Sequence, residues 1–162
     1  MRSHRLLSLF LGTVLVFAAA PASAQQPTYG PAITLAQAKK AMAGAEAEAV
    51  KNKWAVVITI LDSGGNLVLT QRLDGAQFGS IEVAKNKAYS AVAFRRPTKV
   101  FQDALAQGGG NMRLLQLSGA STLEGGIPIV VGGQVVGAIG VSGVTGQQDS
   151  QIAQAGVDAL SK

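Results

Sequence analysis

A glycine-rich stretch, residues 125–143, constrains the fold of this chain more than any other segment. It consists of two runs of β-branched and small apolar residues joined by Gly132-Gly133. Such a link is typical of a β-hairpin, since a type I′ turn requires positive φ at both central residues. Neither run alternates apolar with polar residues, so we expect other elements to cover both faces. The turn predicts three cross-strand pairs: Val131 with Gln134, Val130 with Val135, and Ile129 with Val136.

Glycines at G-x-x-G-x-x-G spacing, Gly137, Gly140 and Gly143, lie in the second run of this stretch. They match neither nucleotide-binding fingerprint, because no Gly-Lys-Ser/Thr follows and the spacing differs from G-x-G-x-x-G. We interpret Gly137 and Gly140 instead as places where another element approaches the strand closely. The loop 142–146 before the last helix is a candidate anion site through helix N-terminal amides, or an ordinary connector.

The first 24 residues have the pattern of a secretory signal peptide. Arg2 and Arg5 precede an apolar run, residues 6–20, that is too short to span a bilayer, and Ala22-Ser23-Ala24 fits the A-x-A cleavage pattern. We therefore expect cleavage after Ala24 and a periplasmic or secreted mature protein. No later apolar run has membrane-spanning length, so we expect no membrane span after cleavage.

The remaining chain has the length of one domain. Residues 25–32 contain two prolines and a glycine and are predicted to be a flexible lead-in, followed by a domain over 33–162. Without the leader, the chain contains twelve Lys and Arg residues and nine Asp and Glu residues, which gives a net charge of +3. This charge is too small to favour nucleic acid as a partner, and no basic stripe with interleaved aromatics supports one.

Histidine and cysteine are missing from the predicted mature chain. The sequence contains no Cys, and its one His, His4, lies in the leader. This excludes a standard zinc site, a Cys-ligated cluster, a His-based catalytic triad and covalently attached haem from the mature protein. We accordingly predict no metal site and find no complete catalytic constellation.

The order of the expected elements indicates an α/β sandwich with a mainly antiparallel sheet flanked by helices. A capping box, Thr34 with Gln37, opens the first helix. Asp62 is expected to form the turn of a second hairpin. In order, we expect a helix over 34–52, strands over 54–61 and 67–72, helices from about 80 to 96 and from Thr98 as cap to about 107, the hairpin of 125–143, and a last helix capped by Asp149 or Ser150. Residues 111–123 are predicted to be either a short strand or a loop over a site.

The helix from about residue 80 carries its apolar face on Ile81, Ala84, Ala88 and Ala91, which directs Lys85, Lys87 and Tyr89 towards other sides. Basic residues could neutralise carboxylates such as haem propionates, or simply form the surface of a slightly basic protein. They are Arg72, Lys85, Lys87, Arg95, Arg96, Lys99 and Arg113.

Three carboxylates, Asp62, Asp74 and Glu124, flank glycine-rich breaks in the chain. Paired carboxylates could serve as acid and base, but turn and cap roles account equally for each of them.

Several linked motifs run along essentially the whole mature chain: 34–52, 56–67, 72–76, Lys87-Ala88, Arg96-Pro97-Thr98, 123–128, 137–143 and Gln148-Asp149. Together, and in this order, they resemble the GlcG/HbpS family of haem-binding domains. The resemblance implies a profilin-like α-β-α sandwich and a homo-oligomer, octameric in some members. It also implies non-covalent binding of haem or a related tetrapyrrole in haem or iron handling; a related domain accompanies corrinoid enzymes.

The resemblance also implies which residues contact the cofactor. Residues in matching motifs are Arg72, Asp74, Lys87, Thr98, Glu124 and Ser142; we add Arg95 as a further carboxylate partner. Some relatives place a histidine on the iron, which this mature chain cannot do. Axial ligation would therefore fall to Tyr89, Tyr29, Met112, Met42, a Thr or Ser hydroxyl, or water. On an alanine-rich apolar stripe, Met42 fits a core residue better than a ligand.

The leading hypothesis is an exported oligomeric module that binds haem or a similar planar anionic cofactor, with Arg72, Lys87 or Arg95 paired to its carboxylates. One alternative is an enzyme acting on a small hydroxy- or oxo-acid, with Asp74 or Glu124 as acid or base. The other is a ligand-free oligomeric interaction protein.

Overall fold

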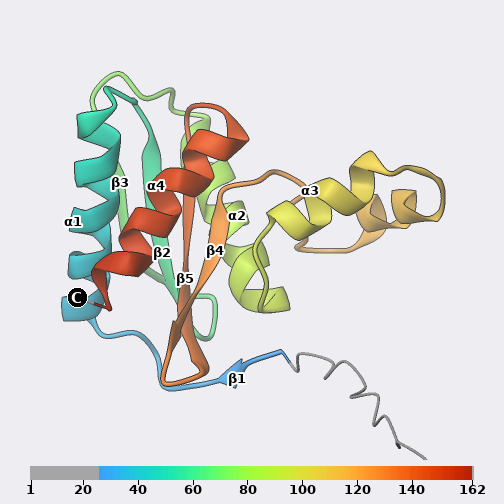
Figure 1. The fold of residues 1–162 in the computed structure, drawn as a ribbon, viewed down its shortest axis with the longest axis horizontal. Helices are drawn as coiled ribbons and strands as arrows, with labels where there is room; N and C mark the ends of the chain where they lie inside the picture. The colour runs from blue at the N-terminus through green and yellow to red at the C-terminus, as the bar shows by residue number, and fades with distance from the viewer. Residues whose placement is uncertain (1–25, 162) are drawn as a thin grey trace, which may run out of the picture.

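Two helices cover one face of a five-stranded sheet and a third helix covers the other (Figure 1). This is a computed structural model, and it describes residues 26–161. The predicted signal peptide lies outside them. The elements are β1 (Thr28–Tyr29), α1 (Leu35–Lys51), β2 (Val57–Asp62), β3 (Leu67–Arg72), α2 (Ser80–Phe94), α3 (Lys99–Ala106), a 3₁₀ helix η1 (Gly109–Gln116), β4 (Gly126–Val131), β5 (Gln134–Ser142) and α4 (Gly146–Ala159). The predicted sandwich is confirmed.

The central strand of the sheet is β5. It pairs antiparallel with β4 on one side and with β2 on the other, and β2 pairs antiparallel with β3. Of the strands in the described part of the chain, the two-residue β1 alone runs parallel to β5. Two predicted pairs of the hairpin are confirmed, Val131 with Gln134 and Val130 with Val135, but Ile129 pairs with Gly137. A register shift between Ile129 and Val130 leaves Val136 out of the ladder, so the third predicted pair is wrong.

The two faces of the sheet pack against different helices. Ile139 and Val141 of β5 belong to the main buried cluster with α1 and α4. Ala138, on the opposite face, packs with Ala91 and Val92 of α2. Alternation of side chains along a strand explains this division. The expectation that both faces of the hairpin are covered is confirmed for β5 but is wrong at the end of β4, where Val130 and Val131 are exposed.

Helix α2 approaches the hairpin unusually closely at a pair of glycines. Gly126 and Gly140 lie opposite each other in β4 and β5. A Cβ added to either would collide with α2 backbone, meeting the Lys87 carbonyl from Gly126 and the Ala84 carbonyl from Gly140. The predicted close approach at Gly140 is therefore confirmed. At Gly137 the close neighbour is the Leu61 carbonyl of β2.

The ends of the helices agree only partly with the sequence pattern. The Thr34–Gln37 capping box is confirmed. For α4, however, the cap is Thr145 in a capping box with Gln148, so the predicted cap at Asp149 or Ser150 is wrong. Thr98 occupies the cap position of α3, but its side chain makes no cap hydrogen bond. Both side chains, Asp149 and Thr98, are instead turned into the protein.

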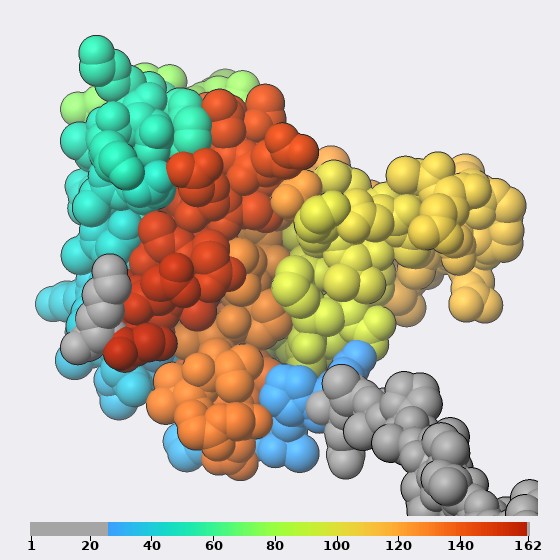
Figure 2. All heavy atoms as spheres, in the orientation of Figure 1, coloured from blue at the N-terminus to red at the C-terminus, as the bar shows by residue number. Residues whose placement is uncertain are grey.

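An arm formed by α3 and η1 projects from the body of the protein (Figure 2). Residues 111–123, predicted to be a strand or a covering loop, are the rest of η1 followed by an irregular segment. The predicted lead-in contains β1, and the Tyr29 hydroxyl donates to the Val92 carbonyl of α2 at 3.0 Å. Among residues 26–161, no helix is long and apolar enough to cross a membrane.

Candidate functional site

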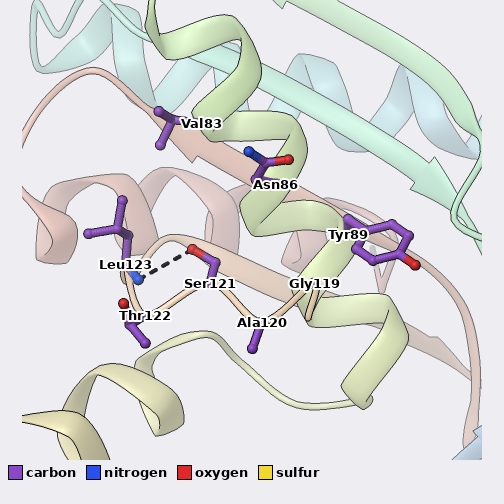
Figure 3. A pocket seen from close by; sticks show the side chains of 8 residues that line it. All are labelled: Val83, Asn86, Tyr89, Gly119, Ala120, Ser121, Thr122 and Leu123. Atoms are coloured by element: carbon purple, nitrogen blue, oxygen red, sulfur yellow. Dashed lines mark hydrogen bonds between the residues drawn. The ribbon is translucent and has the colours of Figure 1, made fainter. Parts of the chain in front are cut away.

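A groove runs between the outer side of α2 and residues 119–123 (Figure 3). Its volume is about 450 Å³. Tyr89 stands at one end, with Val83 and Leu123 at the other, and the Tyr89 hydroxyl points away from them. The wall residues are Val83, Asn86, Tyr89, Gly119, Ala120, Ser121, Thr122 and Leu123. The groove thus combines apolar side chains with hydroxyl and amide groups, and none of the residues that line it within 26–161 is charged.

Hydrogen bonds fix the irregular segment that forms one wall. The Ser121 amide donates to Ser90 Oγ of α2 at 2.9 Å, and the Leu123 amide donates to Ser121 Oγ at 3.3 Å. Gly119 has φ +79°, and a Cβ there would lie 2.8 Å from Tyr89 Cε1. A glycine is therefore required for the segment to pass this close to the Tyr89 ring.

A second cavity, which we call the polar hollow, lies where α2, α3, the end of β5 and the start of α4 meet. Its volume is about 300 Å³. Val83 and Leu123 line both the hollow and the groove, so the two are neighbours. The polar hollow is lined by Gln77, Val83, Lys87, Gln102, Leu123, Glu124, Ser142, Val144, Gly146 and Asp149.

A buried ion pair forms the floor of the polar hollow. Lys87 Nζ donates to Asp149 Oδ2 at 2.7 Å and to the Val141 carbonyl at 2.9 Å. The side chains are 4% and 3% exposed. Burial raises the pKa of Asp149, whereas the hydrogen bond and charge of Lys87 act to lower it. The pair joins α2 on one side of the sheet to α4 on the other.

Glu124, the residue before Gly125, also lines the polar hollow. Its amide donates to Gln102 Oε1 at 2.9 Å, and its carboxylate accepts from Gln102 Nε2 at 3.2 Å. Gln102 belongs to α3, so this amide holds the base of the arm against the start of the hairpin.

Hydroxyl groups complete the surroundings. Thr98 Oγ1 accepts from the Gly126 amide at 2.9 Å, and the Ser142 and Ser80 hydroxyls lie 3.2 Å apart. Three of the predicted site residues, Lys87, Glu124 and Ser142, therefore line the hollow, and a fourth, Thr98, lies beside it at Gly126. They are the polar residues of four separate motifs, and all four are buried.

The other predicted site residues lie elsewhere. Tyr89 is in the neighbouring groove. Arg72 is exposed at the end of β3, and Asp74 lines a shallow hollow with Trp54. Arg95 donates to the Pro27 carbonyl at 3.1 Å and lies over the ring of Tyr29. The structure thus does not gather Arg72, Asp74 and Arg95 with the buried group.

The placement of Lys87 corrects the sequence analysis. It was expected on a side of α2 away from the apolar face, but it is buried with Ala84, Ala88 and Ala91. Positions 84, 87, 88 and 91 follow the three-four spacing of one helix face, which was the available signal. Asn86, Ser90, Gln102 and Ser121 were not predicted at all, since nothing in their local pattern separates them from surface residues.

The candidate iron ligands also differ in their surroundings. Met42 is 3% exposed in the core, as expected for a core residue. The Tyr29 hydroxyl is within hydrogen-bonding distance of two α2 carbonyl groups, and Met112 is exposed on the arm. Tyr89, Ser121 and Thr122 are the hydroxyl residues that line the groove. Within residues 26–161, no three His, Cys, Asp or Glu side chains come together as a metal site.

Comparison with known proteins places these features in a family. The model of the haem-degrading HbpS-like family matches residues 33–158. Protein GlcG of Escherichia coli K12 is 38% identical over 101 residues, covering 62% of this chain and 74% of GlcG. A double mutant of Streptomyces reticuli HbpS has a TM-score of 0.74 and 36% identity, covering 88% of this chain and 98% of that one. The solved PduOC:haem complex has a TM-score of 0.72 and 28% identity, covering 79% and 94%.

Proposed function

This chain belongs to the HbpS-like family, and on that premise we propose that it is an exported, oligomeric module that binds haem or a related tetrapyrrole. The groove beside α2 is the proposed binding site. The observation that carries this assignment is the shape of the groove, which extends from Tyr89 at one end to Val83 and Leu123 at the other. PduOC, of similar fold, forms a complex with haem.

The groove residues suit a planar, largely apolar ligand. Val83, Ala120 and Leu123 supply apolar surface, and Ser121 and Thr122 supply hydroxyl groups at the same wall. The residues that would hold an iron-bearing ligand by a hydroxyl group are Ser121 and Thr122, or Tyr89 if its side chain turned towards the groove. The haem itself would supply any redox chemistry, while these residues would hold and orient it.

Lys85 is the proposed partner of the ligand's carboxylates. It is exposed on α2 and lies four residues before Tyr89, which puts both side chains on one helix face. The polar hollow is less suited to carboxylates, because Glu124 and Asp149 would repel them. This proposal replaces Arg95, whose guanidinium already contacts Pro27 and Tyr29.

Export and assembly are part of the same proposal. The N-terminal pattern of residues 1–24 supports export. The arm exposes Met112, Leu115 and Leu117, with Leu115 58% exposed, and such side chains support contact between copies of the chain. Light scattering should then show a multimer that Leu115→Lys dissociates, and a monomeric wild type would contradict it. Mass spectrometry of the native protein tests cleavage after Ala24.

Titration of haem into the purified protein tests the binding proposal. We expect a saturable Soret shift at micromolar protein, and no shift would overturn the proposal. Lys85→Gln should weaken binding, while Lys39→Gln, an exposed change on α1, should not. Tyr89→Phe keeps the ring but removes the hydroxyl. A changed spectrum supports Tyr89 as ligand, whereas an unchanged spectrum rejects that assignment; Tyr29→Phe is the matched control.

A further inference from the structure

The polar hollow contains a carboxylate whose hydrogen-bonding capacity is mostly unused. Glu124 is 6% exposed, and its side chain accepts one hydrogen bond, from Gln102 Nε2 to Oε2. A carboxylate has about four acceptor positions. Within residues 26–161, Glu124 Oε1 accepts from no protein group. Among residues 26–161, no fully buried side-chain oxygen lacks a hydrogen-bond partner, so Glu124 Oε1 is open to the hollow and offers a strong acceptor to whatever enters it.

The same hollow offers a donor. The Lys87 ammonium has three N–H groups and is 4% exposed. Two of them are used, by Asp149 Oδ2 and the Val141 carbonyl. In the part of the chain that the structure describes, the third has no acceptor. An unused donor and an unused acceptor therefore line one cavity, together with the Ser142 hydroxyl.

The charges around the hollow disfavour a charged ligand. Lys87 and Asp149 offset each other, and the first turn of α4 at Gly146 places positive partial charge, about half a unit, beside Glu124. An incoming anion would meet two carboxylates, and an incoming cation would meet the ammonium of Lys87 and the helix end. A neutral group that both donates and accepts hydrogen bonds avoids both kinds of electrostatic repulsion.

We propose that the polar hollow binds a small uncharged hydroxylated compound, one hydroxyl of which donates to Glu124 Oε1 and accepts from Lys87. The volume of about 300 Å³ sets its size, at the low end of the range of ligand pockets. This site goes beyond the haem-binding proposal, since its residues, apart from Val83 and Leu123, do not line the groove.

Ligand titration followed by amide NMR tests this inference, with three probes of similar size at equal ionic strength. They are erythritol, which is neutral, erythronate, an anion, and 1-amino-1-deoxyerythritol in its ammonium form, a cation. Erythritol should cause saturable shifts at Glu124, Gly146 and Ser142, and the two charged probes should bind at least about tenfold more weakly. Glu124→Gln should weaken erythritol binding roughly tenfold, as expected for loss of a hydrogen bond to a charged group. Glu82→Gln, an exposed change on α2, should leave it unchanged.

Three results would overturn the inference: no saturable shift with erythritol, equal or tighter binding of a charged probe, or shifts confined to residues 119–122. The comparison of probes uses the wild-type protein, so it holds even if Glu124→Gln does not fold. The haem titration reports on the groove independently. A protein that binds erythritol but not haem, or haem but not erythritol, therefore separates the two proposals.

Discussion

Lys87 Nζ lies 2.7 Å from Asp149 Oδ2, and this contact connects helices that pack on opposite faces of the sheet. The ammonium also holds the Val141 carbonyl near the end of β5. Both charged groups are almost fully buried, so each depends on the other for its compensation. The ion pair thus connects the elements around the polar hollow and is also part of its lining.

Removing one partner of this pair should be severely destabilising. Lys87→Met keeps most of the side-chain volume but leaves Asp149 buried without its ammonium, and we expect a loss of about 3 kcal/mol in the free energy of unfolding. Denaturant unfolding measures it. The double variant Lys87→Met with Asp149→Leu should recover part of the loss, whereas Lys85→Met on the exposed side should change stability by less than about 0.5 kcal/mol. Equal losses in the Lys87 and Lys85 variants would contradict a buried role for Lys87.

The closeness of α2 to the hairpin should make the glycine pair intolerant of any side chain. In Gly140→Ala the new methyl group would meet the Ala84 carbonyl, so α2 must move away from the sheet. Overpacking of this kind destabilises by about 1–3 kcal/mol or more. The unfolding midpoint in denaturant should fall accordingly.

Gly79→Ala is the control for that change. Gly79 has φ −59°, and no atom lies within 4 Å of the Cβ it would gain. Its unfolding free energy should stay within about 0.5 kcal/mol of the wild type. If Gly140→Ala were as stable as Gly79→Ala, the close approach of α2 would be wrong.

The sequence pattern was sufficient for the framework of the fold but not for the site. Both hairpins follow from turn chemistry, and α1 follows from its capping box and alanine spacing. The cap at Asp149 is wrong, and Thr98 takes the predicted cap position without a side-chain cap bond, because a side chain of the right type can make tertiary contacts instead: Thr98 accepts from Gly126 and Asp149 accepts from Lys87. The local sequence gives these side chains a preference for cap positions. Long-range packing determines whether each side chain caps a helix or makes a tertiary contact.

Long-range pairing also explains which parts of the site were unpredictable. Glu124 and Gln102 are 22 residues apart, and Lys87 and Asp149 are 62 apart. No spacing rule connects such positions. The family motifs indicated Lys87, Glu124 and Ser142 of the hollow, but Arg72 and Asp74, which form another matching motif, lie outside it. Membership of a motif therefore does not by itself locate a residue in the site.

Thr98 should contribute through its acceptor oxygen. In Thr98→Val the shape is retained, but the buried Gly126 amide loses the hydroxyl at 2.9 Å that accepts its hydrogen. Leaving a buried donor without a partner destabilises by about 1–3 kcal/mol. Thermal and denaturant unfolding should show the loss, and hydrogen exchange at the Gly126 amide should accelerate. Thr98→Ser keeps the acceptor, so its amide should remain protected; if both variants lost protection equally, the hydroxyl would not be the partner.

Asp62 should make the stability of the β2–β3 turn dependent on pH. Although its burial acts to raise the pKa of Asp62, hydrogen bonds from Asn66 and Gly64, including two amides at 2.9 Å, lower it below the ordinary 3.8. The unfolded chain therefore binds a proton first as the pH falls. The stabilisation by ionised Asp62 is complete above the ordinary pKa and is lost as the pH falls through the lowered value.

Urea unfolding across this acidic range should show a steeper loss of unfolding free energy for the wild type than for Asp62→Asn. In carbon NMR, the Asp62 carboxyl should titrate below 3.8. Parallel pH profiles for the two proteins would show that this carboxylate contributes nothing to the turn.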